Sequence, residues 1–422
     1  MEEFRLRDYQ AKIVSDGRRI LDQYNMLYLA MEVRTGKTFC ALFSAEGSKR
    51  VLFVTKKKAI SSIEADFKTS GLDYDLQVIN YESMHKADLN KIDVLILDEA
   101  HGLGAFPKPN KRALTVADFL DSSPKTKVIL LSGTPTPESY SQIYHQFWIK
   151  SDSPLAQNYK SFYTFANHHI DKEKKTIAYG RTVNDYSKCR KDEVFPLIKH
   201  FFIEYSQKQA GFTSEIKEHI LHVKMKDSTY KVINQLKKNL VIGDRVIADT
   251  PVKLQSKLHQ LYSGTIKLED GTRTGFDTTK GEFIKSHFKG RKIAMFYKFI
   301  AEYEILKEVF GEDLCNDIAT FDANPEKHIA LQIQSGREGT KLANADALVF
   351  FNIDFSATSY WQGRDRMTTI DRPVNNVYWI FSEGGIEDKI YNTVVKKKSY
   401  TTYYFKRDFG LNKKKKQIKL DL

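Results

Sequence analysis

The chain contains little cysteine and no long apolar run, and both absences narrow its possible classes. Cys40, Cys189 and Cys315 are its only cysteines among 422 residues, and they are scattered. Such a pattern gives neither a disulfide framework nor a cysteine-based zinc site, and it fits a reducing cytoplasm. No segment is apolar over membrane length, and none resembles a signal peptide. We therefore expect a soluble, cytoplasmic protein without a membrane partner.

Acidic residues are fewer than basic ones, which indicates a polyanionic partner. The chain carries 66 Lys and Arg against 53 Asp and Glu, a formal net charge of +13. Nucleic-acid phosphates attract such charge independently of base sequence, with release of counterions. A membrane surface is the competing polyanion, and the lack of an apolar span disfavours it. A chain of 422 residues with 41% hydrophobic content is expected to form two or three domains.

A phosphate-binding loop is predicted at residues 31–38. The apolar residues 26–30 suit a buried strand, and residues 39–42 open a helix, with Thr35 in the loop between them. Strand, loop and helix N-terminus form the context in which backbone N–H groups and the helix dipole bind anions. This junction therefore predicts a site for the phosphates of a nucleotide.

Three residues of the loop have predicted roles. Gly36 lets the backbone approach the phosphates, Lys37 reaches the β- and γ-phosphates, and the hydroxyl of Thr38 ligates magnesium. Two positions depart from the usual pattern, because Met31 and Arg34 stand where related loops carry glycine. The alternative is a surface turn that contains Gly-Lys-Thr by chance, since short motifs have real false-positive rates.

An acidic pair follows a second buried strand. Residues 94–97 form a continuous apolar run, and Asp98, Glu99 and His101 come directly after it. Ligands bind at this end of the strands in open α/β sheets. Asp98 is predicted to hold Mg²⁺, Glu99 to position and deprotonate the attacking water, and His101 to link the site to the next strand. The alternative is a strand end that caps a helix.

A third strand, predicted at residues 127–131, ends in small hydroxyl residues. Ser132 and Thr134 follow it, with a glycine between them and Pro135 after them. Hydroxyl groups at a strand end are suited to sensing a γ-phosphate and relaying its loss, and proline makes the exit rigid. We therefore assign Ser132 and Thr134 a coupling role.

The order of these motifs resembles that of superfamily 2 helicases and translocases, especially the Swi/Snf-like branch and its compact phage-type members. The resemblance spans nearly the whole chain, and the order is more specific than any single motif. The motifs in chain order are residues 6–10, 35–38, 98–101 (Asp-Glu-Ala-His), 132–135, 335–340 and 360–366.

The resemblance implies roles for further residues of the first lobe. Gln10 would read the adenine edge, which implies ATP, and Arg7 belongs to the same nucleotide-binding motif. An ordinary helix-surface residue is the alternative for Gln10. Lys56, Asn80 and Tyr81 would contact nucleic acid, although related proteins often have proline where Lys56 stands. The alternative for the lysine run that begins there is a solvated loop.

In the second lobe the resemblance implies nucleic-acid contacts at Lys298, Ser335 and Gly336, and nucleotide contact at Gly339. The two glycines follow an expected strand, at a turn where backbone amides can meet a phosphate. The second lobe is therefore expected to contribute to both ligands.

The arginine motif near residue 366 matches the pattern of the family only in part. Gln362 is implied to couple the two activities, and Arg366, four residues later, is implied to be an arginine finger that stabilises charge on the transferred phosphoryl group. A second finger is expected three residues further on, where Thr369 stands. Arg364 or Arg372 are the substitutes, or one finger suffices. The alternative is that these arginines only contact nucleic-acid phosphates.

The expected fold class is α/β, with two RecA-like parallel-sheet lobes, a P-loop NTPase tandem, and a helical connecting region. ATP is expected in the cleft between the lobes. The aromatic residues between 150 and 212 are expected either to stack bases or to pack amphipathic helices. The expected domains are 1–150 (first lobe), 151–250 (connecting region), 251–405 (second lobe) and 406–422 (basic tail).

Taken together, the motifs predict an ATP-dependent DNA helicase or translocase that couples hydrolysis to movement along DNA, or to its remodelling or unwinding. ATP and Mg²⁺ are the expected cofactors. Single-stranded, duplex or branched DNA is the expected partner of a monomer, in the host cytoplasm if the protein is phage-encoded. Two alternatives stay open: an RNA-directed helicase of the same superfamily, and a non-enzymatic basic scaffold with a degenerate ATP site.

Overall fold

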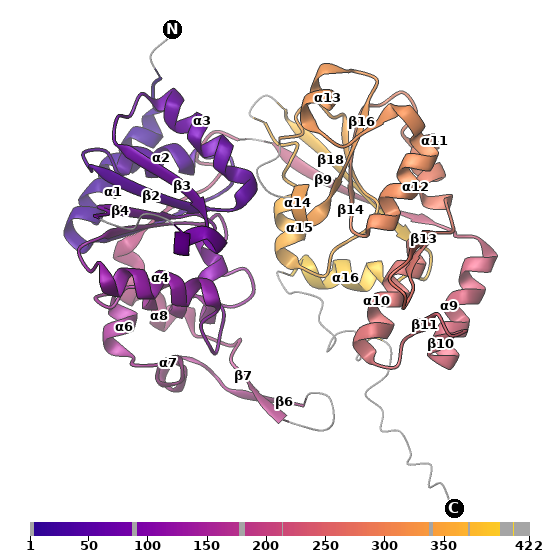
Figure 1. Ribbon diagram of the computed structural model, residues 1–422, viewed down its shortest axis with the longest axis horizontal. Helices are drawn as coiled ribbons and strands as arrows, with labels where there is room; N and C mark the ends of the chain where they lie inside the picture. Colours follow the sequence, from indigo (N-terminus) through magenta and orange to yellow (C-terminus); the bar gives the residue numbers. More distant parts are fainter. Residues whose placement is uncertain are drawn as a thin grey trace, which may run out of the picture. The chain divides into compact units, whose positions relative to one another are not determined.

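The chain folds into two units, each built on its own six-stranded sheet (Figure 1). We call them the N-terminal unit, Met1–Phe212, and the C-terminal unit, Thr213–Leu422. Both sheets are parallel throughout, so the predicted α/β class with two RecA-like lobes is confirmed. The computed structural model describes residues 4–86, 91–176, 182–212, 214–336, 341–369, 372–396 and 408.

The sheet of the N-terminal unit has the strand order β3-β2-β4-β5-β1-β8. Because every pair is parallel, the carboxyl ends of all six strands meet at one edge, where the predicted motifs of this unit begin. The strands are β1 (Met26–Met31), β2 (Arg50–Thr55), β3 (Asp75–Asn80), β4 (Val94–Leu97), β5 (Lys127–Leu131) and β8 (Phe202–Tyr205).

Helices cover both faces of this sheet because alternate strand residues point to opposite sides. Met26 and Tyr28 enter one core, whereas Leu27 and Leu29 enter the other. The face of Leu27 is covered by α1 (Asp8–Tyr24), α2 (Lys37–Ser44) and α3 (Ile60–Ser70). The face of Tyr28 is covered by α4 (Lys111–Ser122), α5 (Ile143–Trp148), α6 (Pro154–Asn158), α7 (Phe162–His169) and α8 (Lys191–Ile198).

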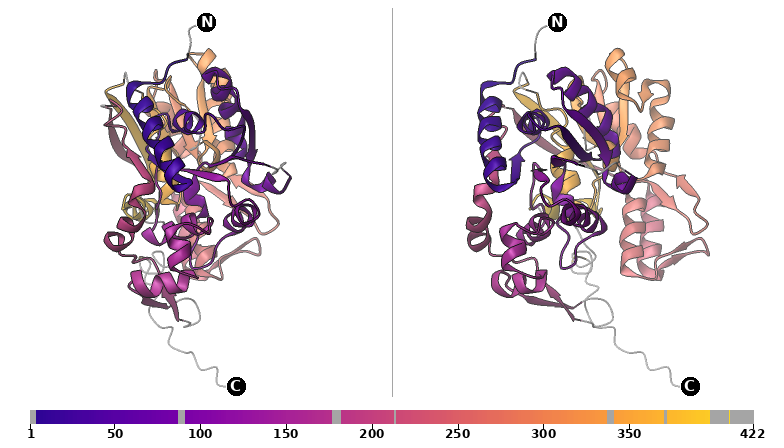
Figure 2. Two further views of the ribbon diagram at one scale, coloured as in Figure 1. Left: turned by 90° about the vertical axis from the view of Figure 1, so that its left-hand side faces the viewer. Right: turned by 60° about the vertical axis from the view of Figure 1, so that its left-hand side comes forward.

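Short elements complete the N-terminal unit. A hairpin of β6 (Glu173–Thr176) and β7 (Thr182–Asp185) extends from it between α7 and α8 (Figure 2). The 3-10 helices are η1 (Lys57–Ala59), η2 (Tyr81–Lys86), η3 (Ala100–Leu103), η4 (Tyr140–Gln142) and η6 (Lys199–Phe201).

The aromatic residues between 150 and 212 mostly pack into the core. Phe162 and Phe165 on α7 are buried and contact the ring of Tyr144 on α5. Tyr163, the next residue of α7 after Phe162, is exposed. Of the two expectations for this region, helix packing is therefore the one that holds for the buried rings.

The sheet of the C-terminal unit has the strand order β15-β16-β14-β17-β18-β9. The strands are β9 (Glu215–Val223), β14 (Ile293–Tyr297), β15 (Leu314–Cys315), β16 (His328–Gln332), β17 (Ala347–Phe350) and β18 (Val374–Ser382). Two small antiparallel sheets lie outside it: β10 (Val241–Ile242) with β11 (Val246–Ile247), and β12 (Thr265–Lys267) with β13 (Arg273–Gly275).

Helices also cover both faces of the second sheet. One face packs against α11 (Thr279–His287) and α12 (Ile300–Phe310). The other packs against α9 (Asp227–Asn239), α10 (Pro251–Tyr262), α13 (Ile318–Ala323), α15 (Ala357–Gly363) and α16 (Glu387–Val394). The remaining helices are α14 (Ile333–Gly336) and η7 (Gly311–Asp313).

The boundary between the units falls inside residues 151–250, the expected connecting region. Two edge strands of this region were not predicted: β8 joins the N-terminal sheet beside β1, and β9 joins the C-terminal sheet beside β18. Edge strands are exposed on one side, so their charged residues break the apolar run that marks a central strand.

Two further observations concern the described residues. None of their helices combines the length and apolar character that crossing a membrane requires. Cys40 and Cys315 are buried free thiols, and Cys189 is a half-buried one.

Candidate active site

The loop after β1 turns through two left-handed residues. Arg34 has φ 65° and Gly36 has φ 78°, and the buried Thr35 between them donates a 2.7 Å hydrogen bond to the carbonyl of Glu32. A Cβ on Gly36 would lie 2.0 Å from Nε2 of Gln10. Position 36 therefore requires glycine for two reasons, its positive φ and its lack of space for a side chain. The loop then enters α2, whose first amides have no partner within the helix and face outward from its N-terminus.

The two departures from the usual phosphate-loop pattern have structural explanations. Met31 is the last residue of β1, where it pairs with Tyr205 of β8 and places its side chain in the core. An extended residue there needs no glycine. Arg34 adopts the left-handed conformation that glycine adopts more easily, at a cost of about 1 kcal/mol.

Helix α1 holds the loop from one side. Gln10 Nε2 and Tyr9 Oη both donate to the carbonyl of Thr35, at 3.4 and 3.1 Å, and the main-chain N–H of Arg7 donates to Gln10 Oε1 at 3.0 Å. The ring of Tyr9 stacks on that of Tyr205. Both ends of the Gln10 amide are thus bonded within the unit, so Gln10 joins α1 to the loop. Its contact with adenine stays a prediction.

The turn after β8 holds the same loop from the other side. Gln207 donates from its main chain to the carboxylate of Glu32 at 2.7 Å, and from Nε2 to the carbonyl of Val33 at 3.0 Å. This contact could not be predicted from the sequence, because Gln207 lies 175 positions from Glu32 and belongs to no recognised motif.

Asp98 stands at the end of β4 with its two carboxylate oxygens in different surroundings. Oδ2 accepts a 2.9 Å hydrogen bond from Thr55 Oγ1, and the main-chain carbonyl accepts one of 2.7 Å from Tyr81 Oη. Oδ1 is shielded from solvent and has no hydrogen-bond partner in the described part of the chain. Burial raises the pKa of Asp98, as does the nearby charge of Glu99, whereas the ammonium of Lys37 lowers it.

A magnesium ion fits this arrangement. A carboxylate oxygen without a partner is a ligand suited to a hard cation, and the half-buried Thr38 in the first turn of α2 offers a hydroxyl oxygen. The described residues hold no cluster of three or more acidic, histidine or cysteine side chains that would bind a metal alone. Protein sites for Mg²⁺ typically supply one or two carboxylates and rely on substrate phosphates for the rest.

Glu99 and His101 extend the site toward β5. Glu99 is held in a left-handed conformation with φ 51°, unusual for a residue with a side chain. His101 Nδ1 lies 3.2 Å from Glu99 Oε2 and 3.0 Å from Ser132 Oγ, which in turn accepts from the N–H of Thr134 at 3.2 Å. The structure therefore brings together the side chains of Glu99, His101 and Ser132, and it adds the main-chain N–H of Thr134.

The turn after β5 also approaches the phosphate loop. A Cβ on Gly133 would lie 3.3 Å from the carbonyl oxygen of Met31, closer than side chains usually come. Because β5 lies between β4 and β1, this turn contacts the phosphate loop on one side and His101 on the other. The three predicted motifs thus form one site.

The predicted nucleic-acid contacts of this unit lie at the same edge of the sheet. Lys56 follows β2 and is half-buried, and Asn80 ends β3, where its Oδ1 accepts from the N–H of Ser83 at 2.7 Å. Tyr81 is buried, with the guanidinium of Arg112 over its ring, so that ring does not offer a stacking surface. A nucleic-acid contact therefore fits Lys56 and Asn80 better than Tyr81.

In the C-terminal unit the predicted arginines have partners within the unit. Arg366 is buried and donates from Nε to the carbonyl of Gln362 at 2.9 Å. Oε1 of Gln362 is buried and has no hydrogen-bond partner among the residues that the structure describes. Arg364 forms a 2.6 Å ion pair with Glu218, and Arg372 donates to a main-chain carbonyl at 2.7 Å. Arg364 is thus engaged in structure and fits the role of second finger poorly. Nη1 of Arg372 is buried without a hydrogen-bond partner in the described residues, so Arg372 stays a candidate for that role.

The structure describes the surroundings of two further predicted residues of this unit, Lys298 and Gly336. Lys298 forms a 2.5 Å ion pair with Asp354, and both side chains are largely buried. Gly336 ends α14 where a Cβ would clash with side chains of β14 and β16, so its glycine is required for packing. Gly339 lies outside the described residues, as does the side chain of Ser335.

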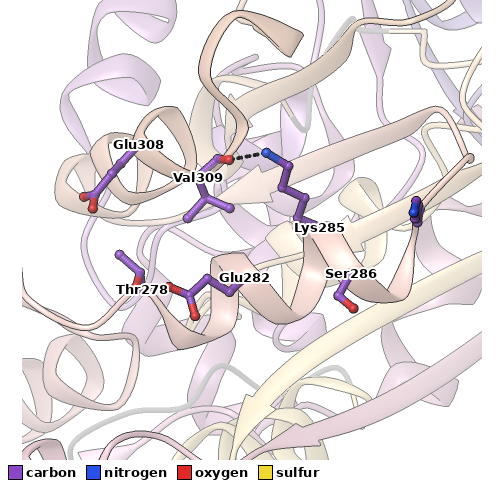
Figure 3. Close-up of a pocket in the computed structure, with 7 residues that line it drawn as sticks. Thr278, Glu282, Lys285, Ser286, Glu308 and Val309 are labelled. Carbon is purple, nitrogen blue, oxygen red and sulfur yellow. Dashed lines mark hydrogen bonds between the residues drawn. The ribbon is translucent and has the colours of Figure 1, made fainter.

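A shallow pocket elsewhere in the C-terminal unit involves none of the predicted residues (Figure 3). Its polar groups bond locally: Lys285 donates to the carbonyl of Val309 at 2.7 Å, and Thr278 donates to Glu282 at 2.5 Å. We assign it no function. It lies between α11 and α12 and is lined by Thr278, Glu282, Lys285, Ser286, Lys289, Glu308 and Val309.

Comparisons with known proteins give likeness to solved structures alone. No protein-family model and no curated protein matches the chain. The SWI2/SNF2 ATPase core of Sulfolobus solfataricus in complex with dsDNA is 18% identical, covers 97% of this chain and 94% of its own, and has a TM-score of 0.43. The core domain of the same organism is 19% identical, with coverages of 94% and 90% and a TM-score of 0.40. Likeness at this level identifies neither a substrate nor a reaction.

Proposed function

We propose that the chain is a nucleic-acid-dependent ATPase that couples hydrolysis to movement along DNA. One observation carries the proposal. Oδ1 of Asp98 is buried without a partner in the described residues, within the electrostatic reach of Lys37 and at the sheet edge that bears the phosphate loop. A buried, unsatisfied carboxylate oxygen beside a phosphate loop is the arrangement expected where a cation and a nucleotide bind.

The residues of the N-terminal unit have complementary tasks in hydrolysis. The amides at the start of α2 and the ammonium of Lys37 bind and orient the phosphates of ATP. Thr38 and Asp98 would hold Mg²⁺, which when bound neutralises charge on the β- and γ-phosphates. A carboxylate oxygen of Glu99 accepts the proton of the attacking water. His101 holds that carboxylate and, through Ser132, connects it to β5.

DNA is the proposed partner because the chain is strongly basic and because residues suited to phosphate binding lie at the same sheet edge as the proposed ATP site. The formal net charge is +13, and Lys56 and Asn80 stand at the sheet edge that carries the ATP site. ATP hydrolysis at that edge would therefore change the affinity of these residues for the nucleic-acid backbone. Unwinding, branch migration and the displacement of bound protein are all outcomes of such movement.

Release of phosphate from ATP by the purified full-length chain tests the proposal. It is measured alone and with single-stranded DNA, duplex DNA, forked DNA or RNA. Stimulation by DNA supports the proposal, and stimulation by RNA alone would assign the chain to RNA-directed helicases. No hydrolysis under any condition would make it a binding scaffold. Displacement of a labelled strand from the fork then distinguishes unwinding from movement without unwinding.

A further inference from the structure

We propose that Thr55 is a positioning residue that orients the carboxylate of Asp98, so that Oδ2 is occupied and Oδ1 is presented to the divalent cation. The inference rests on the proposed function, because it assumes that Asp98 binds a metal ion together with a nucleotide. Thr55 belongs to none of the motifs named above. The inference is that it determines which carboxylate oxygen of Asp98 binds the cation.

The pairing of two strands brings Thr55 to Asp98. Strands β2 and β4 are parallel neighbours, and their register sets Val54 opposite Leu97. The residues that follow are Thr55, the last of β2, and Asp98, directly after β4. The N–H of Asp98 continues the ladder by donating to the carbonyl of Val54 at 2.9 Å. Thr55 Oγ1 then reaches Asp98 Oδ2 at 2.9 Å.

Packing in the core does not explain why residue 55 carries a hydroxyl group. The four residues before it, Val51–Val54 in β2, are wholly buried and apolar, and Thr55 itself has no exposed surface. Valine would fill the same space, and a buried hydroxyl costs free energy unless it is bonded. The partner that satisfies it is Asp98, so the choice of threonine over valine is explained by that carboxylate.

Two contacts fix Asp98 from different directions. Thr55 holds one carboxylate oxygen, while Tyr81 Oη holds the main-chain carbonyl at 2.7 Å. Rotation of the carboxylate would exchange its two oxygens, and the Thr55 bond opposes that rotation. Groups that orient a metal ligand in this way typically change metal affinity by about 10–100-fold when removed.

The test measures cation binding directly. The full-length chain is saturated with a non-hydrolysable ATP analogue, and binding of Mn²⁺, a paramagnetic substitute for Mg²⁺, is followed by electron paramagnetic resonance. Thr55→Val is expected to weaken Mn²⁺ binding by roughly 10–100-fold, whereas Thr55→Ser, which keeps the hydroxyl, restores binding close to wild type. Binding of the analogue without metal is expected to stay unchanged.

A matched control exists in the same unit. Thr126, directly before β5, is also buried and donates from Oγ1 to the carbonyl of Ile92 at 2.7 Å, at the edge of the sheet opposite to Asp98. Thr126→Val removes an equivalent hydrogen bond and is expected to leave Mn²⁺ binding unchanged. If Thr55→Val does not fold, as judged by its thermal unfolding curve, Thr55→Ala removes the same hydroxyl and is expected to weaken Mn²⁺ binding to a similar extent. Tyr81→Phe, which removes only the bond to the main-chain carbonyl of Asp98, is expected to weaken it less.

The outcomes separate this inference from the proposed function. If Asp98→Asn loses Mn²⁺ binding while Thr55→Val and Tyr81→Phe keep wild-type affinity, the positioning role is overturned and the ATP site stands. If Asp98→Asn itself binds Mn²⁺ like the wild type, the proposed function fails. Equal losses in Thr55→Val and Thr126→Val would also overturn the inference, since they would show a general effect of removing a buried hydroxyl.

Discussion

The two units share one architecture but treat the polar groups at the carboxyl edge of their sheets differently. In the N-terminal unit that edge contains Glu99 in a left-handed conformation and Asp98 with one carboxylate oxygen unsatisfied. The ammonium of Lys37 is close enough to lower the pKa of Asp98. In the C-terminal unit the predicted Lys298 is neutralised by Asp354 at the corresponding edge, and Arg364 pairs with Glu218, a residue within β9. One predicted residue of this unit, Gln362, keeps a buried Oε1 without a hydrogen-bond partner in the described residues. A site that is to receive a ligand leaves polar groups to be satisfied by it, whereas internal ion pairs stabilise a scaffold.

The difference between the units is therefore chemical rather than topological. Both sheets have six parallel strands with helices on two faces. The N-terminal unit contains the phosphate loop and the acidic pair in a single site. The C-terminal unit offers one buried arginine, Arg366, whose catalytic role stays a prediction.

The largest expected effect tests the catalytic half of the comparison. Lys37→Ala and Glu99→Gln are both expected to abolish DNA-stimulated ATP hydrolysis, because one loses a phosphate ligand and the other the base for water. Glu99→Gln is expected to keep binding ATP, measured with a fluorescent analogue. Lys49→Ala, at an exposed lysine before β2, is the control and should hydrolyse ATP normally. Normal turnover by Glu99→Gln would contradict the assignment.

A second experiment asks whether the C-terminal unit takes part in chemistry. Arg366→Ala is expected to lower kcat by about 10³-fold while KM for ATP changes little, as for arginine fingers in other nucleotide hydrolases. Arg273→Ala, an exposed arginine on β13, is the matched control. If Arg366→Ala lowers stability and leaves kcat intact, Arg366 belongs to the scaffold, and the contrast between the units becomes complete.

A third experiment tests the scaffold role of the C-terminal unit. Glu218 accepts hydrogen bonds from Tyr360, Trp379 and Tyr391 besides its ion pair with Arg364. Glu218→Ala is expected to lower the free energy of unfolding by about 3 kcal/mol, since it leaves a charge and several donors without an acceptor. Urea unfolding measures the loss. Nucleotide binding by the variant should remain, and its disappearance would show that the two units are not independent.

The smallest effect concerns the cost of the active site itself. The pKa of Asp98 is raised in the folded protein, which means that folding disfavours its charged form. The charged carboxylate therefore lowers the free energy of unfolding at pH values above that raised pKa. Without metal or nucleotide, Asp98→Asn is expected to raise Tm at pH 7, by about 2–4 °C for each kcal/mol recovered. The gain should disappear as pH falls below the ordinary aspartate value of about 4, where both states are protonated. A variant less stable than wild type at pH 7 would contradict this.

The sequence predicted those features that depend on local pattern. Continuous apolar runs located the central strands, and β4 occupies the predicted residues 94–97. The edge strands β8 and β9 were missed because charged residues such as Glu204 and Lys217 interrupt their apolar character. The acidic pair and the phosphate loop were predicted to meet, since both follow parallel strands.

Contacts that depend on strand register were out of reach. Thr55 meets Asp98 from 43 positions away only because β2 and β4 pair as they do. Gln207 supports the phosphate loop because β8 lies beside β1, a strand that the sequence did not reveal. The burial of Tyr81 was missed for the same reason, because its hydroxyl reaches the carbonyl of Asp98 after β4, two strands away from β3 in the sheet.

The concentration of the site at one edge of the N-terminal sheet leaves the opposite edge available for labelling. The turn before β2 is exposed there: Gly47 has open space around it, and the side chain of Lys49 is exposed. A fluorophore on a cysteine introduced at Lys49 would report on the proposed movement of single molecules along tethered DNA, and it would not touch the predicted catalytic groups. Cys40 and Cys315 are buried, so Cys189 alone among the native thiols would have to be replaced first.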